Sequence, residues 1–131
     1  MKKLILTTIL STLFLAINTF QQEKTAEKLI VGTWVAEGES LSSRWIFKSN
    51  GECLMYDENE VLDTYIFKLS TTSPQCGIEV DTGPEEKYLS LTNKSNNKDK
   101  MCYLLDFVDD KKLSMIYLGG SDYEPILFTR K

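Results

Sequence analysis

Short apolar segments, each followed by a polar or glycine-containing turn, repeat along this sequence from residue 29 to residue 130. Within residues 44–48, Trp45 and Phe47 alternate with other side chains, which is the pattern of a strand with one buried face. The dipeptide Asn50-Gly51 that follows is typical of a tight hairpin turn. No apolar pattern with a helical period extends beyond a single turn. The sequence therefore predicts an all-β protein.

The repeat indicates nine short strands joined mostly by connections of hairpin length, so that neighbours in sequence pair in space. The simplest closed arrangement is an antiparallel up-and-down meander barrel of eight to nine strands, which leaves no exposed sheet edge. An open β-sandwich is the competing fold, and pairing of the first strand with one of the last would exclude it. The expected strands span residues 29–37, 44–48, 53–56, 61–69, 77–80, 88–91, 101–108, 113–118 and 126–130.

The N-terminus has the pattern of a secretory signal peptide. Lys2 and Lys3 precede an apolar run over residues 4–17, which is short for a membrane span. We expect residues 1–20 to be the signal peptide, with cleavage near Gln21, and an uncleaved anchor is the alternative. Residues 21–28 would form a short helical or flexible lead-in to a barrel domain at 29–131. The mature protein is then expected to be secreted or periplasmic, with no stable membrane span after cleavage.

Composition excludes several function classes. The chain has 19 acidic against 15 basic residues, and an acidic surface repels nucleic-acid phosphates. Histidine is absent, which removes the side chain most used for proton transfer near neutral pH and the commonest metal ligand. We therefore expect a non-enzymatic protein with no catalytic residues, no metal, no cofactor and no nucleic-acid partner.

Three cysteines in an exported chain allow one disulfide, for which three pairings are possible. Cys76 and Cys102 begin expected strands that are two apart and run in the same direction, which places both at one end of the barrel. Cys53 is followed by the apolar residues Leu54 and Met55 and is interpreted as a small core side chain. The favoured pairing is Cys76 with Cys102.

Four short motifs resemble the lipocalin superfamily, and most of all the small bacterial lipocalin-like domains. The resemblance covers residues 29–131. Its motifs are a G-x-W on the first strand, a W-x-F, a turn with N-G and a final F-x-R, here Gly32-Thr33-Trp34, Trp45-Ile46-Phe47, Asn50-Gly51 and Phe128-Thr129-Arg130.

The resemblance implies a structural role for Gly32, Trp34 and Arg130. In lipocalins the first-strand tryptophan closes the floor of the barrel, and an arginine near the last strand packs across it. By position, Trp34 and Arg130 would form this pair, with the guanidinium over the indole face.

A closed barrel would direct one set of aromatic and methionine side chains inward. They would line a site for a small hydrophobic molecule in the barrel interior, entered near loops 70–75 and 93–100; a packed core is the alternative. A protein-binding barrel, such as an exported protease-inhibitor-like or surface interaction module, is the second functional hypothesis, and a purely structural surface protein is the third. The expected ligand-binding residues are Trp45, Phe47, Met55, Tyr65, Phe67, Tyr103, Phe107, Met115 and Tyr117.

Overall fold

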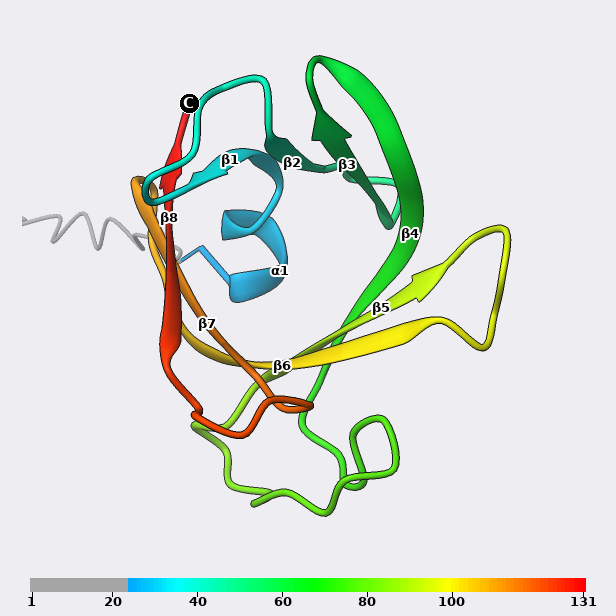
Figure 1. Cartoon of the computed structure of the whole chain (residues 1–131). Coiled ribbons are helices and arrows are strands. Elements are labelled where there is room, and N and C mark those ends of the chain that lie inside the picture. The colour runs from blue at the N-terminus through cyan, green and yellow to red at the C-terminus, as the bar shows by residue number, and fades with distance from the viewer. Residues whose placement is uncertain (1–23) are drawn as a thin grey trace, which may run out of the picture.

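The computed structural model describes residues 24–131, which form a closed antiparallel barrel (Figure 1). Each strand pairs with its neighbour in sequence, and β1 also pairs with β8, so the up-and-down barrel is confirmed and the sandwich is excluded. The predicted signal peptide, residues 1–20, lies outside the described residues. The elements are α1 (Ala26–Leu29), β1 (Gly32–Ala36), β2 (Arg44–Phe47), β3 (Glu52–Asp57), β4 (Glu60–Ser70), β5 (Tyr88–Asn93), β6 (Lys100–Val108), β7 (Lys112–Tyr117) and β8 (Pro125–Arg130).

The connections alternate between the two ends of the barrel because every strand reverses direction. We call the end that holds α1 the floor; the β2–β3 turn, the β4–β5 loop and the β6–β7 turn also lie there. The opposite end, with the β1–β2, β3–β4, β5–β6 and β7–β8 connections, is the mouth. Loops 70–75 and 93–100 were expected to flank one opening, and this is wrong, because β5 runs the length of the barrel between them. None of the helices within residues 24–131 has the length and apolar character needed to cross a membrane.

Trp34 and Arg130 seal the floor. Trp34 is fully buried, and its indole Nε1 donates a hydrogen bond of 2.7 Å to the carbonyl oxygen of Ile30. The Arg130 guanidinium carbon lies 4.3 Å from the centre of the indole ring. The same guanidinium donates to the carbonyl oxygens of Val31, at 2.8 Å, and Leu29. The pair implied by the lipocalin resemblance is therefore present, and it also ties the strand carrying Arg130 to the segment between α1 and β1.

Gly32 lets the chain enter β1 beside that guanidinium. Its φ of +146° is rarely adopted by residues with a side chain, and a Cβ atom there would collide with Arg130. The strand begins at Gly32, and not at residue 29 as expected, because residues 26–29 form a single helical turn that ends beneath the barrel core.

The predicted fifth strand, residues 77–80, is absent from the barrel. Cys76 and Gly77 have φ values of +49° and +76°, so the backbone reverses where a strand would have to begin. An isolated bridge between Gln75 and Ile78 is the only β pairing of this segment among the described residues. The barrel consequently has eight strands, and residues 71–87 form one long loop.

A disulfide fixes this loop to the outer surface of the barrel. Cys76 and Cys102 are bonded, with their Cα atoms 5.9 Å apart, which confirms the favoured pairing. Cys102 is the third residue of β6 and faces outward beside Tyr88. Ile78 in the loop packs against this outer cluster. The long loop is therefore held along the outside of β5 and β6.

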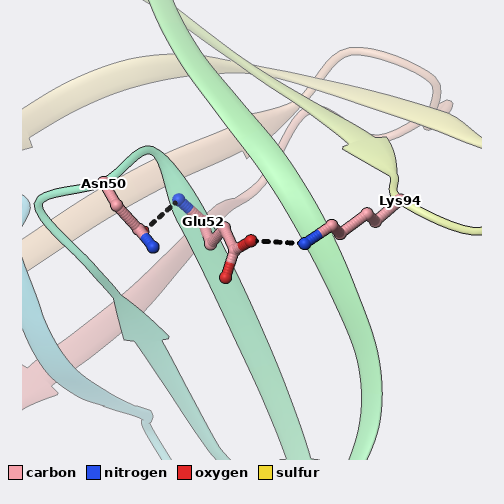
Figure 2. Close-up of polar contacts among 3 residues, drawn as sticks. All are labelled: Asn50, Glu52 and Lys94. Carbon is pink, nitrogen blue, oxygen red and sulfur yellow. Dashed lines mark hydrogen bonds and ion pairs between the residues drawn. The ribbon is translucent and has the colours of Figure 1, made fainter.

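A surface ion pair joins three strands on another part of the outer surface (Figure 2). The Lys94 ammonium lies 2.6 Å from a carboxylate oxygen of Glu52, reaching across β4 from the end of β5 to the start of β3. The backbone amide of Glu52 donates to the side-chain oxygen of Asn50 at 3.1 Å. The hydrogen bond from Lys94 lowers the pKa of Glu52, and because both groups face solvent the pair orients these strands more than it stabilises them.

Candidate ligand-binding site

The floor half and the centre of the barrel are filled with side chains. Phe47 is 1% exposed, and Leu91 and Met115 are fully buried. The ring of Phe47 meets that of Phe67 edge to face with centroids 5.1 Å apart. Since a cavity large enough for water would leave its lining side chains accessible, this region is a packed core. Seven of the nine residues of the expected site belong to this core or pack directly against it. Phe47, Tyr65, Tyr103 and Met115 are members of the core, and Trp45, Met55 and Phe67 pack against it.

The mouth is lined by inward-facing side chains that, apart from the buried Tyr103, are only partly buried. Trp45 and Met55 are half-buried, and Tyr117 is 39% exposed. The Tyr103 ring stands 6.2 Å from Trp45 on one side and 5.4 Å from Tyr117 on the other, measured between ring centroids. Met101, which the sequence analysis did not single out, is half-buried beside them. These five residues, called the aromatic rim below, form a shallow apolar surface above the core.

A polar cluster adjoins this rim on β4 and β5, between Met55 on β3 and Met101 on β6. Asn93, 9% exposed, donates through its amide nitrogen to the carboxylates of Asp63 at 3.2 Å and Asp99 at 3.0 Å. The hydroxyl of Tyr65 donates to the same Asp99 oxygen at 3.2 Å. Neither carboxylate forms an ion pair within residues 24–131. Two negative charges therefore share one amide at the edge of an apolar surface.

Sequence reasoning missed this cluster for two reasons. Asp63 shares the inward face of β4 with Tyr65 and Phe67, so strict alternation already points to it, but an acidic side chain is not expected inside a barrel. Asn93 was assigned to a solvated loop, whereas it is the last residue of β5 and is buried. Asp99 joins them only because the β5–β6 loop folds back over the mouth, which no local pattern shows.

Tyr65 and Tyr103, two of the three tyrosines at this end, are hydrogen-bond donors at neutral pH. Burial raises the pKa of Tyr103 to about 12, with smaller contributions from Tyr117 and Tyr65. Burial also raises the pKa of Tyr65, and the carboxylates of Asp99 and Asp63 act in the same direction. Both hydroxyls keep their protons, which they donate within the site: that of Tyr65 to Asp99, at 3.2 Å, and that of Tyr103 to the sulfur of Met101, at 3.7 Å.

Phe107 does not belong to this site, although it was expected to face inward. A β-bulge lies between Leu105 and Phe107, where β6 has one more residue than β7. The extra residue reverses the alternation, so that Leu105 faces Met115 in the core and Phe107 pairs with Ser114 on the outside. Phe107 is 45% exposed.

The described part of the chain contains no group of three histidine, cysteine, aspartate or glutamate side chains placed to hold a metal ion. Cys53, the free cysteine, is fully buried, and burial raises the pKa of its thiol to about 12. Its thiolate is therefore not formed at neutral pH, and a substrate cannot reach the sulfur in the closed barrel.

Comparison with known proteins finds no matching family model, no similar curated protein and no similar solved structure. The closed eight-stranded antiparallel barrel is consistent with a calycin-like fold. The resemblance to lipocalins in particular rests on the motif residues and on the floor that Trp34 and Arg130 form.

Proposed function

We propose that this chain is an exported, non-enzymatic binding protein with a lipocalin-like barrel, and that it takes a small apolar ligand at the mouth. The observation that carries the proposal is the difference between the two ends. The floor is closed by Trp34 and Arg130, whereas the inward-facing Trp45, Met55 and Tyr117 remain partly accessible at the mouth. Partly exposed aromatic and methionine side chains on a rigid scaffold are suited to binding an apolar surface.

The polar cluster indicates what else the ligand would carry. Trp45, Met55 and Asp63 are successive register partners across β2, β3 and β4, so the carboxylate of Asp63 lies next to the aromatic rim. An apolar molecule with a cationic or hydrogen-bond-donating group would match this surface, because the carboxylates accept hydrogen bonds and the indole face attracts cations.

The disulfide supports export. Structural disulfides persist in oxidising compartments and are rare in the reducing cytosol. The bond between Cys76 and Cys102 therefore agrees with the signal-peptide pattern of residues 1–20. The proposed location is the periplasm or the extracellular space.

A pair of simple amphiphiles tests the proposed ligand class. Dodecylamine and dodecanoic acid, each below its micellar concentration, would be titrated against the protein while tryptophan fluorescence is recorded. We expect the amine to bind more tightly and to change the emission of the accessible Trp45, while Trp34 is shielded. Asp63→Asn should reduce the preference for the amine, and Tyr117→Ala should weaken both ligands. Equal binding of both amphiphiles by the wild type and by Asp63→Asn would remove the polar cluster from the site.

Native mass spectrometry of protein purified from its own host tests the function itself. A small molecule that co-purifies, and is lost in a Trp45→Ala variant, would support the carrier function. Ligand-free protein that retains a protein partner would contradict it.

A second candidate, a protein-binding barrel, is favoured by one separate observation. Phe107 and Leu127 are 45% and 43% exposed on the outer surface, beside a hollow of about 420 Å³. Exposed apolar patches of this kind mark interaction sites. Loss of a co-purifying partner from a Phe107→Ser/Leu127→Ser variant, with Tyr117→Ser as the matched change at the mouth, would favour this function over the carrier.

A further inference from the structure

We propose a second binding site, for a phosphate group, in a hollow on the outer surface of the barrel. The hollow has a volume of about 570 Å³ and lies between the outward faces of β4, β5 and β6 and the segment that ends in the disulfide. This volume falls within the range of small-molecule sites, about 300 to 1,000 Å³. Its lining includes Lys68, Ser70, Gln75, Ser90, Thr92 and Lys100.

Two lysines stand on either side of a row of hydroxyl groups in this hollow. Lys68 on β4 pairs in register with Ser90 on β5, and Lys100 on β6 pairs with Thr92 on β5. The hydroxyls of the central strand therefore lie between the two ammonium groups. An anion placed over β5 can be reached by both lysines and by both hydroxyls.

The positive charge of the hollow is not compensated. Neither Lys68 nor Lys100 forms an ion pair with any residue of the described range, whereas Lys94 on the same outer surface is paired with Glu52 (Figure 2). No carboxylate occurs among the described residues that line the hollow. In a chain with a net charge of −4, two unpaired cations in one concave site favour an anionic ligand.

A buried glutamine holds one side of the hollow in place. Gln75 is 5% exposed, and its amide nitrogen donates to the hydroxyl oxygen of Ser70 at 2.9 Å and to the carbonyl oxygen of Thr72 at 2.6 Å. Because the Ser70 oxygen accepts this bond, its own proton is available to a ligand. The adjacent disulfide fixes Cys76 to β6. The donors are therefore arranged before any ligand binds, which reduces the entropic cost of binding.

These groups match phosphate better than an apolar or neutral ligand. Lysine binds phosphate as a compact point charge, and hydroxyl groups donate to its remaining oxygens. No aromatic side chain lines the hollow within the described residues, so it offers no stacking surface for a sugar ring or a base. The phosphate could belong to a soluble ester or to a phospholipid headgroup.

Three probes distinguish these sources: inorganic phosphate, glycerol 3-phosphate, and phosphatidylcholine vesicles with and without phosphatidylglycerol. Calorimetric titration and vesicle co-sedimentation would be measured on the wild type and on Lys68→Gln, Lys100→Gln and Lys111→Gln. The first two variants each remove one ammonium from the hollow, and the third makes the same change in charge in the β6–β7 turn. All three side chains are exposed, so the variants should keep the wild-type melting temperature, which would be checked.

We expect Lys68→Gln and Lys100→Gln each to weaken binding about tenfold or more, because each removes a charge-assisted hydrogen bond, while Lys111→Gln leaves it within about twofold. Binding of the soluble phosphates identifies a small ester as the ligand, and binding of the anionic vesicles alone identifies a lipid headgroup. The proposal is overturned if no probe binds at millimolar concentration, or if Lys111→Gln weakens binding as much as the two hollow variants.

Discussion

At the scale of single residues, the floor of the barrel depends on three residues that the fold brings together from β1 and β8. Trp34 fills the floor, Arg130 covers it, and Gly32 leaves the space that the guanidinium needs. Each is useful only with the other two, since a side chain at Gly32 would displace Arg130 and expose the indole. The G-x-W and F-x-R motifs are therefore two halves of one structural unit.

Replacing Trp34 by alanine should lower the free energy of unfolding by about 3 to 5 kcal/mol, as for other buried aromatic truncations. The loss has two parts, the cavity beneath the core and the unpaired carbonyl of Ile30. Urea denaturation would measure this loss of stability, with Trp45→Ala as the matched control. Trp45 is only half-buried, so its replacement should cost less free energy. Equal midpoints for Trp34→Ala and the wild type would remove Trp34 from the floor.

The two side chains with the largest shifts in pKa predict a loss of stability at alkaline pH. Burial raises the pKa of Cys53 from 9.0 to about 12 and that of Tyr103 from 10.0 to about 12. From about pH 9 upward the unfolded chain therefore releases protons that the folded chain keeps, and the free energy of unfolding falls as the pH rises toward 12. Urea denaturation at several pH values, compared with a Cys53→Ala/Tyr103→Phe variant, would measure this. A variant with the same pH dependence as the wild type would contradict it.

At the scale of elements, alternation predicted the strands well and failed where the backbone departs from a regular pleat. The inward face of β4 follows from sequence because Tyr65, Phe67 and Leu69 are spaced by two. The outward position of Phe107 does not, since a bulge is set by pairing with β7 and has no local signature. Residues 77–80 look like a strand, but Cys76 before them and Gly77 at their start have positive φ, and Ile78 and Val80 pack on the outside of the barrel.

The disulfide was predicted correctly from an argument that was only partly right. Cys76 does not begin a strand; it lies in the β4–β5 loop and meets Cys102 on the outer surface of β6. The sequence provided the expectation of export and the apolar residues Leu54 and Met55 after Cys53, and these were sufficient to favour one of three pairings.

Removing this disulfide should loosen the loop and leave the barrel folded. The bond joins residues 26 apart, for which chain entropy suggests a stabilisation of about 3 kcal/mol. In a Cys76→Ala/Cys102→Ala variant we expect that loss in urea denaturation, together with faster proteolysis within residues 71–87. Cys53→Ala is the control and should not change the cleavage of the loop. Cleavage at the same rate in all three proteins would show that the loop is held by its packing alone.

At the scale of the whole molecule, sequence predicted the barrel and left the state of its interior open. Length and turn spacing define a meander, but whether eight strands enclose a core or a cavity depends on how side chains from different strands interpenetrate. The position of Trp45 determines much of how the interior is filled. The centroid of its ring lies 5.1 Å from that of Phe128 and 6.2 Å from that of Tyr103. Because the interior is filled, we propose the ligand site at the mouth. The polar side of this site could be recognised only from the three-dimensional structure.

Closure of the barrel should be visible in amide hydrogen exchange. In a closed barrel, β1 and β8 are each hydrogen-bonded on both sides, like the strands between them. We therefore expect the amides of Trp34 and Phe128 to exchange as slowly as those of Leu91 and Met115. Rapid exchange confined to β1 and β8 would show that the barrel opens along this seam.

The seam between β1 and β8 also sets the order in which the protein can acquire its structure. The contact between Arg130 and Val31 spans 99 positions of the chain, so the barrel cannot close until the polypeptide has been synthesised as far as Arg130. Until then β1 has one unpaired edge, and the last strand to have emerged has another. β-proteins with long-range strand pairing fold more slowly than helical proteins of similar size, and open edges recruit other extended chains. We therefore expect this polypeptide to expose unpaired strand edges for longer than a helical protein of equal length, until its final strand has paired with β1.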